Sequence, residues 1–240
     1  MPELPEVETT CRGLSAKLLG QILHDVNFRR ANLRTTLPRP MIPAVRGAKI
    51  TAITRHSKYA LIHLDQGGVI ILHLGMSGRM SFMPFGAEPG KHDHVIFHYG
   101  SPRQKKWDQL FFNDARRFGV LDYTTKEALA EHKLIAGLGN IYVCEALFLA
   151  KVSPERPANQ LTMAEVTALV KGIHKVLNAA IAAGGSSLRD YAHTDGNLGY
   201  FQTKFKVYGH EGDACPRCKN MIARIVQSGR SSFFCPVCQV

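Results

Sequence analysis

The feature that most restricts the fold of this chain is a pair of Cys-x-x-Cys sequences near its end, formed by Cys215 with Cys218 and by Cys235 with Cys238. Four thiolates at this spacing match the closed tetrahedral ligand set of a structural zinc site. A bound metal stabilises a segment that is too short to bury a core of its own. The sequence therefore predicts one structural Zn²⁺ held between two knuckles on β-hairpins.

The charge balance narrows the class of partner. The 240 residues include 30 Lys and Arg against 19 Asp and Glu, which gives a formal net charge of +11. Such a chain favours a polyanion, so nucleic acid is the first expected partner and an anionic membrane surface is the alternative. The sequence has no apolar run of about 18 residues and no signal-peptide pattern at its start. We therefore expect a soluble, unexported, cytoplasmic protein without a membrane partner.

At the start of the chain, Pro2 follows the initiator Met1 and precedes Glu3. A small second residue usually allows removal of the methionine, which would leave Pro2 with a free secondary amine. Because α-amino groups titrate near ~8, part of this amine is unprotonated at neutral pH and can attack a carbonyl carbon to form a Schiff base. Glu3 would serve beside it as an acid and base.

The same stretch also has a purely structural interpretation. Pro5 suits a first helical turn, and apolar residues then recur at helical spacing, at positions 7, 11, 14 and 18. This pattern predicts an amphipathic helix that ends at Gly20. Only the rest of the chain can decide whether the helix also carries chemistry.

Residues 21–123 consist mainly of short apolar runs with turn signals between them. Strands are expected at 50–55, 59–64, 69–74, 94–99 and 109–112, with a hairpin turn at 65–68. Short strands of this kind predict a β-sandwich or barrel.

Several turns in this region carry candidate functional residues. Lys58, at the mouth of a strand, has the reach to bind a phosphate, although a surface lysine is the commoner case. Met76, on a glycine-containing loop, suits either a wedge in a base stack or a cover over a hydrophobic gap. Arg116 can pair with a base edge while Phe118 stacks. Residues 91–94 cannot converge on one metal ion, because adjacent strand residues face opposite sides, and this favours a structural role.

From about residue 124 the composition becomes helical, which marks a domain boundary. Helices are expected from Thr125 to Leu134, at 141–150, and from the capping box of Thr162 and Glu165 to the glycines at 184–185. The turn at 137–141 brings backbone N–H groups close enough to bind a phosphate, or simply stops a helix. Residues 186–202 are polar and glycine-rich, which predicts a mobile loop.

Together these sequences resemble the formamidopyrimidine-DNA glycosylases, bacterial repair enzymes that excise oxidised purines such as 8-oxoguanine. The resemblance is carried by residues 2–9, the Lys58 segment, 74–78, 116–119, 137–142, 195–201 and the four cysteines. It implies an α+β fold in three parts. These are an N-terminal helix with a catalytic β-sandwich at 1–123, a helical helix-two-turns-helix domain that binds DNA at 124–204, and a zinc finger with a β-hairpin at 205–240.

The resemblance also implies roles for single residues. The expected catalytic residues are Pro2 as nucleophile, Glu3 as general acid and base, Lys58 as a phosphate-binding aid, and Arg230. The expected DNA-binding residues are Met76, His92, Arg116, Phe118, Asn140 and Tyr142. Within this set, Met76, Arg116 and Phe118 resemble a trio that fills the void left by a flipped nucleotide. Asn140 and Arg230 resemble phosphate clamps, and residues 194–201 resemble a loop that closes on the extruded base.

In such an enzyme the damaged base is flipped out of double-stranded DNA and Pro2 attacks the sugar C1′, so that the base leaves and an iminium remains. β-Elimination followed by δ-elimination then cuts the strand on both sides of the sugar. Leu4 and the 116–118 segment favour this activity over the alternative, an endonuclease VIII-type glycosylase for oxidised pyrimidines. We expect the protein to act as a monomer with one structural Zn²⁺.

One departure from the family pattern lies between the domains. Where the family continues with a linker and further helices, this chain passes from Tyr123 through His132 directly to Lys133. We therefore expect the helical domain to be shortened at 124–133. This leaves an alternative of another class, a zinc-finger DNA-binding protein of the same family whose catalysis is impaired.

Overall fold

The computed structural model describes residues 2–125, 138–186, 199–227 and 229–240. The chain forms two compact units, one of Met1–Gly137 with Ser186–Gly199 and one of Leu138–Gly185 with Tyr200–Val240. Each unit is built around a hydrophobic core of its own. The finer boundaries expected at 123/124 and 204/205 stay predictions.

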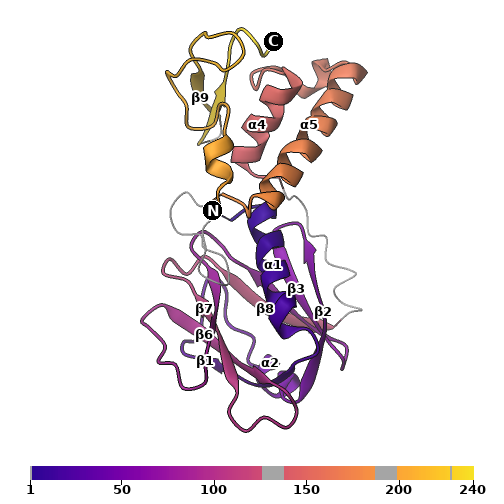
Figure 1. The fold of residues 1–240 in the computed structure, drawn as a ribbon, viewed down its shortest axis with the longest axis vertical. Helices are drawn as coiled ribbons and strands as arrows, with labels where there is room; N and C mark the ends of the chain where they lie inside the picture. The colour runs from indigo at the N-terminus through magenta and orange to yellow at the C-terminus, as the bar shows by residue number, and fades with distance from the viewer. Residues whose placement is uncertain (1, 126–137, 187–198, 228) are drawn as a thin grey trace. The chain divides into compact units, whose positions relative to one another are not determined.

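The first unit is an antiparallel β-structure with one long helix across it (Figure 1). Its elements are α1 (Leu4–Leu18), β1 (Ile22–Phe28), α2 (Met41–Val45), β2 (Ala48–His56), β3 (Tyr59–Leu64), β4 (Gly68–His73), β5 (Arg79–Met83), β6 (Asp93–Gly100), β7 (Asp108–Asn113) and β8 (Val120–Thr125). The strand order is β5-β7-β6-β1-β2-β3-β4-β8. Because β1 pairs with β2 only at Ile22 and Leu23, the sheet divides there into the two layers of a sandwich.

The strands and the first helix confirm the sequence pattern. All five expected strands form, and the four apolar positions of α1 are buried at 5% exposure or less: Val7, Cys11, Leu14 and Leu18. They pack into the core between the layers, which is why a helix of this pattern lies against β2 and β3. The chain leaves α1 through Gly20, whose φ of 79° is the left-handed conformation that glycine adopts readily.

The second unit combines two helices with a small hairpin. Its elements are α4 (Asn140–Ala150), the 3₁₀ turn η1 (Ala158–Gln160), α5 (Met163–Ala182), the 3₁₀ turn η2 (Phe201–Lys204), β9 (Ala223–Gln227) and β10 (Arg230–Phe234). Helix α4 packs closely on α5 at Gly172. A Cβ atom at this position would lie only 3.1 Å from the Ala146 carbonyl oxygen, so the absence of a side chain allows the close approach. Thr162 caps α5 and accepts a hydrogen bond from the Glu165 N–H, as expected.

Two expectations for this region need comment. Thr125, the expected cap of a helix to Leu134, is instead the last residue of β8, and the remainder of that expected helix lies outside the described residues, as does most of the loop at 186–202. The last two residues of that loop, Phe201 and Gln202, begin η2, so the expectation of an unstructured segment is wrong at its end. The reason is the buried Phe201 side chain, whose ring lies 5.9 Å from that of Tyr142. No described helix is long and apolar enough to cross a membrane.

A buried carboxylate joins α4 to the segment that leads to the hairpin. Glu145 is 3% exposed and accepts backbone N–H groups from Lys206, Val207 and Tyr208, each at 3.0 Å. These bonds compensate the carboxylate for the water it loses on burial. The Glu145 side chain therefore fixes the path of residues 206–208 against the helix.

This arrangement predicts the effect of Glu145→Gln on stability. The amide would turn an NH₂ donor toward backbone donors, leaving one of them unpaired at a cost of about 1–3 kcal/mol. The midpoint of thermal unfolding of the zinc-loaded protein measures this loss. Glu155→Gln, an exposed control, should stay within about 0.5 kcal/mol of the parent. Equal midpoints for Glu145→Gln and the parent would contradict the assignment.

Candidate active site and metal centre

The N-terminus is held in place by a buried pair of glutamates. Glu3 precedes α1 as its N-cap, and its N–H donates to the Glu6 carboxylate at 2.7 Å. The second oxygen of Glu6 accepts the Ser186 N–H, also at 2.7 Å. Glu3 and Glu6 are 4% and 2% exposed, and Pro2 is buried beside them. A reactive amine at Pro2 would thus lie in a fixed backbone position next to a desolvated carboxyl group.

Glu6 was not among the expected site residues. Its signal was present in the sequence, because an acidic residue three positions after an N-cap residue forms a capping box. Its bond to Ser186 had no such signal, since 180 residues separate the two.

Lys58 lies on the tight turn between β2 and β3, as expected. His56 pairs with Tyr59, so only Ser57 and Lys58 form the turn, and Ser57 takes a φ of 55°. Arg55 supports this geometry by donating to the Ser57 carbonyl at 2.9 Å and to the Glu8 carboxylate of α1 at 2.9 Å. The Lys58 side chain is therefore carried by a turn that is tied to the same helix as Glu3.

His73 is a neighbour of Lys58 that the sequence did not reveal. Burial lowers the pKa of His73, and the charges of Lys58 and Arg34 lower it further. Its Nδ1 accepts the Gly75 N–H at 3.0 Å, so the neutral ring carries its proton on Nε2. An imidazole donor at this position, next to the strand residue Tyr59 that follows Lys58, is a candidate partner for a phosphate group.

The loops that carry Met76 and Arg116 are joined by a buried network. Asp114 is fully buried, and its carboxylate accepts the Ser77 hydroxyl at 2.6 Å and the Gly119 N–H at 2.7 Å. The Ser77 oxygen in turn accepts the Arg116 N–H at 3.0 Å. One carboxylate thus holds residues from both loops.

The side chains that these loops present are available to a partner. Phe118 is 43% exposed, and the Arg116 guanidinium lies 5.2 Å from the centre of its ring. Met76 is half-buried on the neighbouring loop. A Cβ atom at Gly75 would lie 2.5 Å from the Gly119 nitrogen, so only glycine allows the two loops to approach this closely. His92 is attached to the same assembly, because its carbonyl accepts the Asp114 N–H at 2.9 Å.

In the second unit, Asn140 and Arg230 are brought together although 90 residues separate them. Asn140 begins α4, and its side-chain amide donates to the carbonyl of Ser231, the residue after Arg230, at 2.7 Å. Arg230 is exposed at the start of β10. The expected position of Tyr142 differs, because its side chain is fully buried against Phe201 and presents no surface to DNA.

The four predicted cysteines converge on one point. Their sulfur atoms all lie within 4.8 Å of one another, around the β9–β10 hairpin. Hydrogen bonds from Asn220 lower the pKa of Cys218 to about 6, whereas the Cys218 thiol raises the pKa of Cys238 to about 12. Four thiolates this close repel one another, so a divalent cation is needed to deprotonate them all. The set fits the tetrahedral thiolate coordination of zinc and leaves no position for a substrate.

Arg217 attaches the first cysteine knuckle to α4. Its guanidinium donates to the Phe148 carbonyl at 2.7 Å and lies 4.2 Å from the centre of the Phe148 ring. The zinc-binding segment is therefore packed on the helix that begins with Asn140. This contact gives the metal a role in the stability of the second unit.

Comparison with known families agrees with this geometry. Residues 1–121 match the formamidopyrimidine-DNA glycosylase N-terminal domain, 112–192 match the H2TH domain of the same family, and 212–240 match the zinc finger found in FPG and IleRS. Formamidopyrimidine-DNA glycosylases of Novosphingobium aromaticivorans and Paracoccus denitrificans are 42% and 43% identical to the chain, with all of both chains covered.

Solved structures show the same fold. A Lactococcus lactis FPG mutant bound to Fapy-dG-containing DNA matches with a TM-score of 0.87 at 31% identity, over 99% of each chain. The Lactococcus lactis Fpg in complex with DNA containing an abasic site matches with a TM-score of 0.84 at 30% identity, over 100% of each chain. The chain belongs to the formamidopyrimidine-DNA glycosylase family, and one structural zinc held by its four cysteines belongs to that assignment.

The buried network predicts that Ser77→Ala weakens DNA binding. Loss of the hydroxyl leaves an Asp114 oxygen and the Arg116 N–H without this partner, which costs about 1–3 kcal/mol and loosens both loops. We expect affinity for a duplex with an abasic-site analogue to fall about fivefold or more, since about 1 kcal/mol corresponds to this factor. Ser81→Ala, on β5 outside the network, is the control. Equal affinities of the two variants would contradict the proposed coupling.

The metal site predicts one zinc per chain by elemental analysis. Cys235→Ser should release the zinc and weaken DNA binding more than it unfolds the first unit, because the site is local to the second unit. Cys11→Ala, which removes a thiol from the first unit, should leave the zinc content unchanged. A well-folded protein without zinc would be incompatible with the assignment.

Proposed function

We propose that this protein is a bifunctional DNA glycosylase and AP lyase that removes oxidised purines, including 8-oxoguanine and formamidopyrimidines, in base-excision repair. The proposal rests on one observation above all. The Glu3–Glu6 capping box fixes Pro2 at the N-terminus beside a buried carboxyl group. Family membership and the complexes of the Lactococcus lactis relatives with damaged DNA support the substrate class.

The chemistry requires removal of Met1, which converts the Pro2 nitrogen into a secondary amine. This amine attacks C1′ of the flipped nucleotide, the C1′–base bond breaks, and the base leaves with a proton supplied by an acid. The C1′–O4′ bond then breaks, O4′ takes up a proton, and the nitrogen lone pair forms the C1′=N bond of an iminium on the opened sugar. Loss of the C2′ proton to a base expels the 3′ phosphate, and a second elimination expels the 5′ phosphate. Glu3 is the group we assign to these proton transfers.

The other site residues divide into two groups. We assign Met76, Arg116 and Phe118 to the void left by the flipped nucleotide, which suits an exposed ring stacked with a guanidinium and a half-buried methionine. We assign Lys58, His92, Asn140 and Arg230 to the phosphates around the lesion. His73 joins this second group because it pairs with Tyr59, the residue after Lys58, and its neutral ring offers an Nε2 donor. Tyr142 keeps a supporting role in the core beneath Asn140.

The choice of purine lesions over oxidised pyrimidines rests on Leu4 and the 116–118 segment. The alternative remains a glycosylase of the endonuclease VIII type. Parallel excision assays with 8-oxoguanine and with an oxidised pyrimidine decide between them. We further propose that the protein acts as a monomer on double-stranded DNA in the cytoplasm, at the nucleoid.

The nucleophile is tested by borohydride trapping on DNA that contains 8-oxoguanine. Reduction of the iminium should fix a covalent adduct on Pro2, identified by mass spectrometry of the N-terminal peptide. Pro2→Gly keeps an amine of altered basicity and geometry, so trapping should fall about tenfold or more. Glu3→Gln should lose base release while DNA affinity survives. Abundant adduct on Lys58 would contradict the assignment.

The alternative function, DNA binding with impaired catalysis, follows from the length of the chain, which is shorter than its relatives. The alignment with the Novosphingobium protein spans 277 positions, whereas this chain has 240 residues. Apolar side chains of α5 are exposed, with Met163 at 78% and Val170 at 48%. These observations support a shortened helical domain, and they favour a DNA-binding protein of impaired catalysis as the alternative. The expected junction at 124–133 lies almost entirely outside the described residues.

The two functions differ in their response to repair of this junction. If the junction limits activity, inserting a family-like segment between His132 and Lys133 should raise excision of 8-oxoguanine and the melting temperature together, because added helices cover apolar surface on α5. If the chain as given already excises 8-oxoguanine at the rate of the extended version, the junction is dispensable and the impaired-catalysis alternative is wrong.

A further inference from the structure

The first unit carries exposed cations at a distance from the residues assigned above. Strands β6 and β7 run between two ends of the sheet: His92 and Asp114 lie at one end, and residues 101–107 join the strands at the other. Because β6 spans 8 residues, roughly 20 Å separates the two ends. Three cations are exposed in the joining loop: Arg103, Lys105 and Lys106.

This loop is held in one conformation by Gln104. The side-chain oxygen of Gln104 accepts the Ser101 N–H at 3.2 Å, and its side-chain nitrogen donates to the Lys106 carbonyl at 2.6 Å. The Trp107 ring donates to the Gln104 carbonyl at 2.9 Å and stacks on His24, with 4.4 Å between the ring centroids. A loop ordered by these contacts loses little entropy when a ligand binds to its outward side chains.

The charges of the loop are available to a ligand. Within the part of the chain that the structure describes, the side chains of Arg103 and Lys105 form no hydrogen bond or ion pair. The loop cations stand against two carboxylates, that of Asp108, which is half-buried, and that of Glu88 in the preceding loop. The net charge that a ligand meets is therefore positive.

An exposed aromatic ring lies beside these cations. Phe85, in the loop after β5, is 54% exposed, and the Lys106 ammonium lies 5.6 Å from the centre of its ring. Phe82, earlier in the same segment, has the Lys17 ammonium 4.7 Å from the centre of its ring. An exposed ring beside unpaired cations offers a stacking surface and phosphate partners at the same place.

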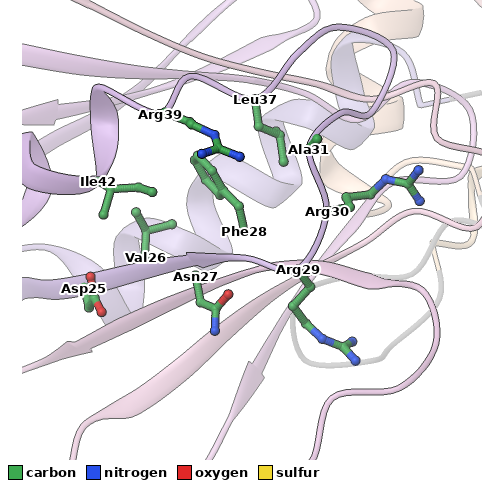
Figure 2. A pocket seen from close by; sticks show the side chains of 10 residues that line it. All are labelled: Asp25, Val26, Asn27, Phe28, Arg29, Arg30, Ala31, Leu37, Arg39 and Ile42. Atoms are coloured by element: carbon green, nitrogen blue, oxygen red, sulfur yellow. The ribbon is translucent and has the colours of Figure 1, made fainter.

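A second group of arginines in the same unit differs from this one. Arg29, Arg30 and Arg39 line a pocket at the end of β1, and Figure 2 shows Arg39 beside Phe28. Phe28 packs against the core of the sandwich and is only partly exposed. Arg39 is itself exposed, so it provides a matched control for charge without an exposed stacking ring.

We propose that the 101–107 loop and Phe85 form a binding site for a single strand of nucleic acid. A base would stack on Phe85, and phosphates along the strand would pair with the three loop cations. A DNA duplex would leave Phe85 without a role, because its bases are already stacked on one another. An acidic peptide would pair with the cations, but apolar peptide side chains bind best in pockets, whereas a flat base suits an exposed ring. The chain would then hold a duplex and an unpaired strand at the same time.

The test uses full-length, zinc-loaded protein saturated with a duplex that contains an abasic-site analogue, so that the duplex-binding face is occupied. A fluorescein-labelled strand of about 12 thymidines is then followed by anisotropy. We expect saturable binding that weakens about fivefold or more in Arg103→Glu, whereas Arg39→Glu, with the same charge change, should bind like the parent. Phe85→Leu keeps an apolar side chain but removes the ring, and it should also weaken binding about fivefold or more.

Trp107 gives an independent signal, because it is the only tryptophan in the chain. An unlabelled thymidine strand should change the fluorescence of Trp107 over the same range of concentration as in the anisotropy titration. Phe85→Leu should shift this change to higher concentration. A Trp107 signal that does not respond to the bound strand would place the strand elsewhere and contradict the proposal.

Other results would overturn the proposal as well. They are an absence of saturable binding up to about 1 mM strand, equal affinities of Phe85→Leu and the parent, equal losses in Arg103→Glu and Arg39→Glu, or loss of strand binding once the duplex is bound. If a peptide of alternating Glu and Phe displaces the strand and binds more tightly, the surface is a protein interface instead. Far-UV circular dichroism confirms that each variant is folded. Excision of 8-oxoguanine should be unchanged in Phe85→Leu, and a fall in excision would assign Phe85 to the glycosylase site.

Discussion

The carboxylate of Glu6 holds together two parts of the chain that are far apart in sequence. It accepts the N–H of Glu3 at the start of α1 and the N–H of Ser186, so fraying of the N-terminus from the first unit would break a buried hydrogen bond. The same helix buries Val7 and Leu14 in the core of the sandwich. The position of α1 therefore determines both the packing of the sandwich core and the location of Pro2.

Two other buried carboxyl groups, those of Asp114 and Glu145, hold separate segments of the chain in the same way. Asp114 accepts a hydroxyl and an N–H from the loops that carry Met76 and Phe118, and Glu145 accepts three N–H groups from the segment before the zinc-binding hairpin. In each case a carboxyl group removed from water accepts hydrogen bonds from several donors at once, and these bonds hold the backbone of the donor segments in place. Rigid loops keep functional side chains in place before a substrate arrives, which lowers the entropy lost on binding.

Local patterns in the sequence predicted the parts of the molecule that depend on local physics. The apolar spacing of α1, the capping box of Thr162 and each Cys-x-x-Cys pair are patterns of residues close together in sequence, and each predicted its local structure correctly. Asp114, His73 and the link from Glu6 to Ser186 could not be predicted in this way, because their partners are set by which loops meet in the folded chain. The buried side chain of Tyr142 shows the reverse error, since a motif position does not say whether a side chain or its backbone faces outward.

Glu6 positions the amine and the acid at the N-terminus, and the rate of base excision measures this role most directly. Glu6→Gln keeps the shape of the side chain but turns a donor toward one backbone N–H, at a cost of about 1–3 kcal/mol. Single-turnover excision of 8-oxoguanine should then fall by a factor of about 10 to 100, while affinity for a duplex with an abasic-site analogue changes less than about threefold. Glu88→Gln, exposed in the same unit, should excise at the parent rate. If Glu6→Gln also excises at that rate, Glu6 does not position the reactive groups.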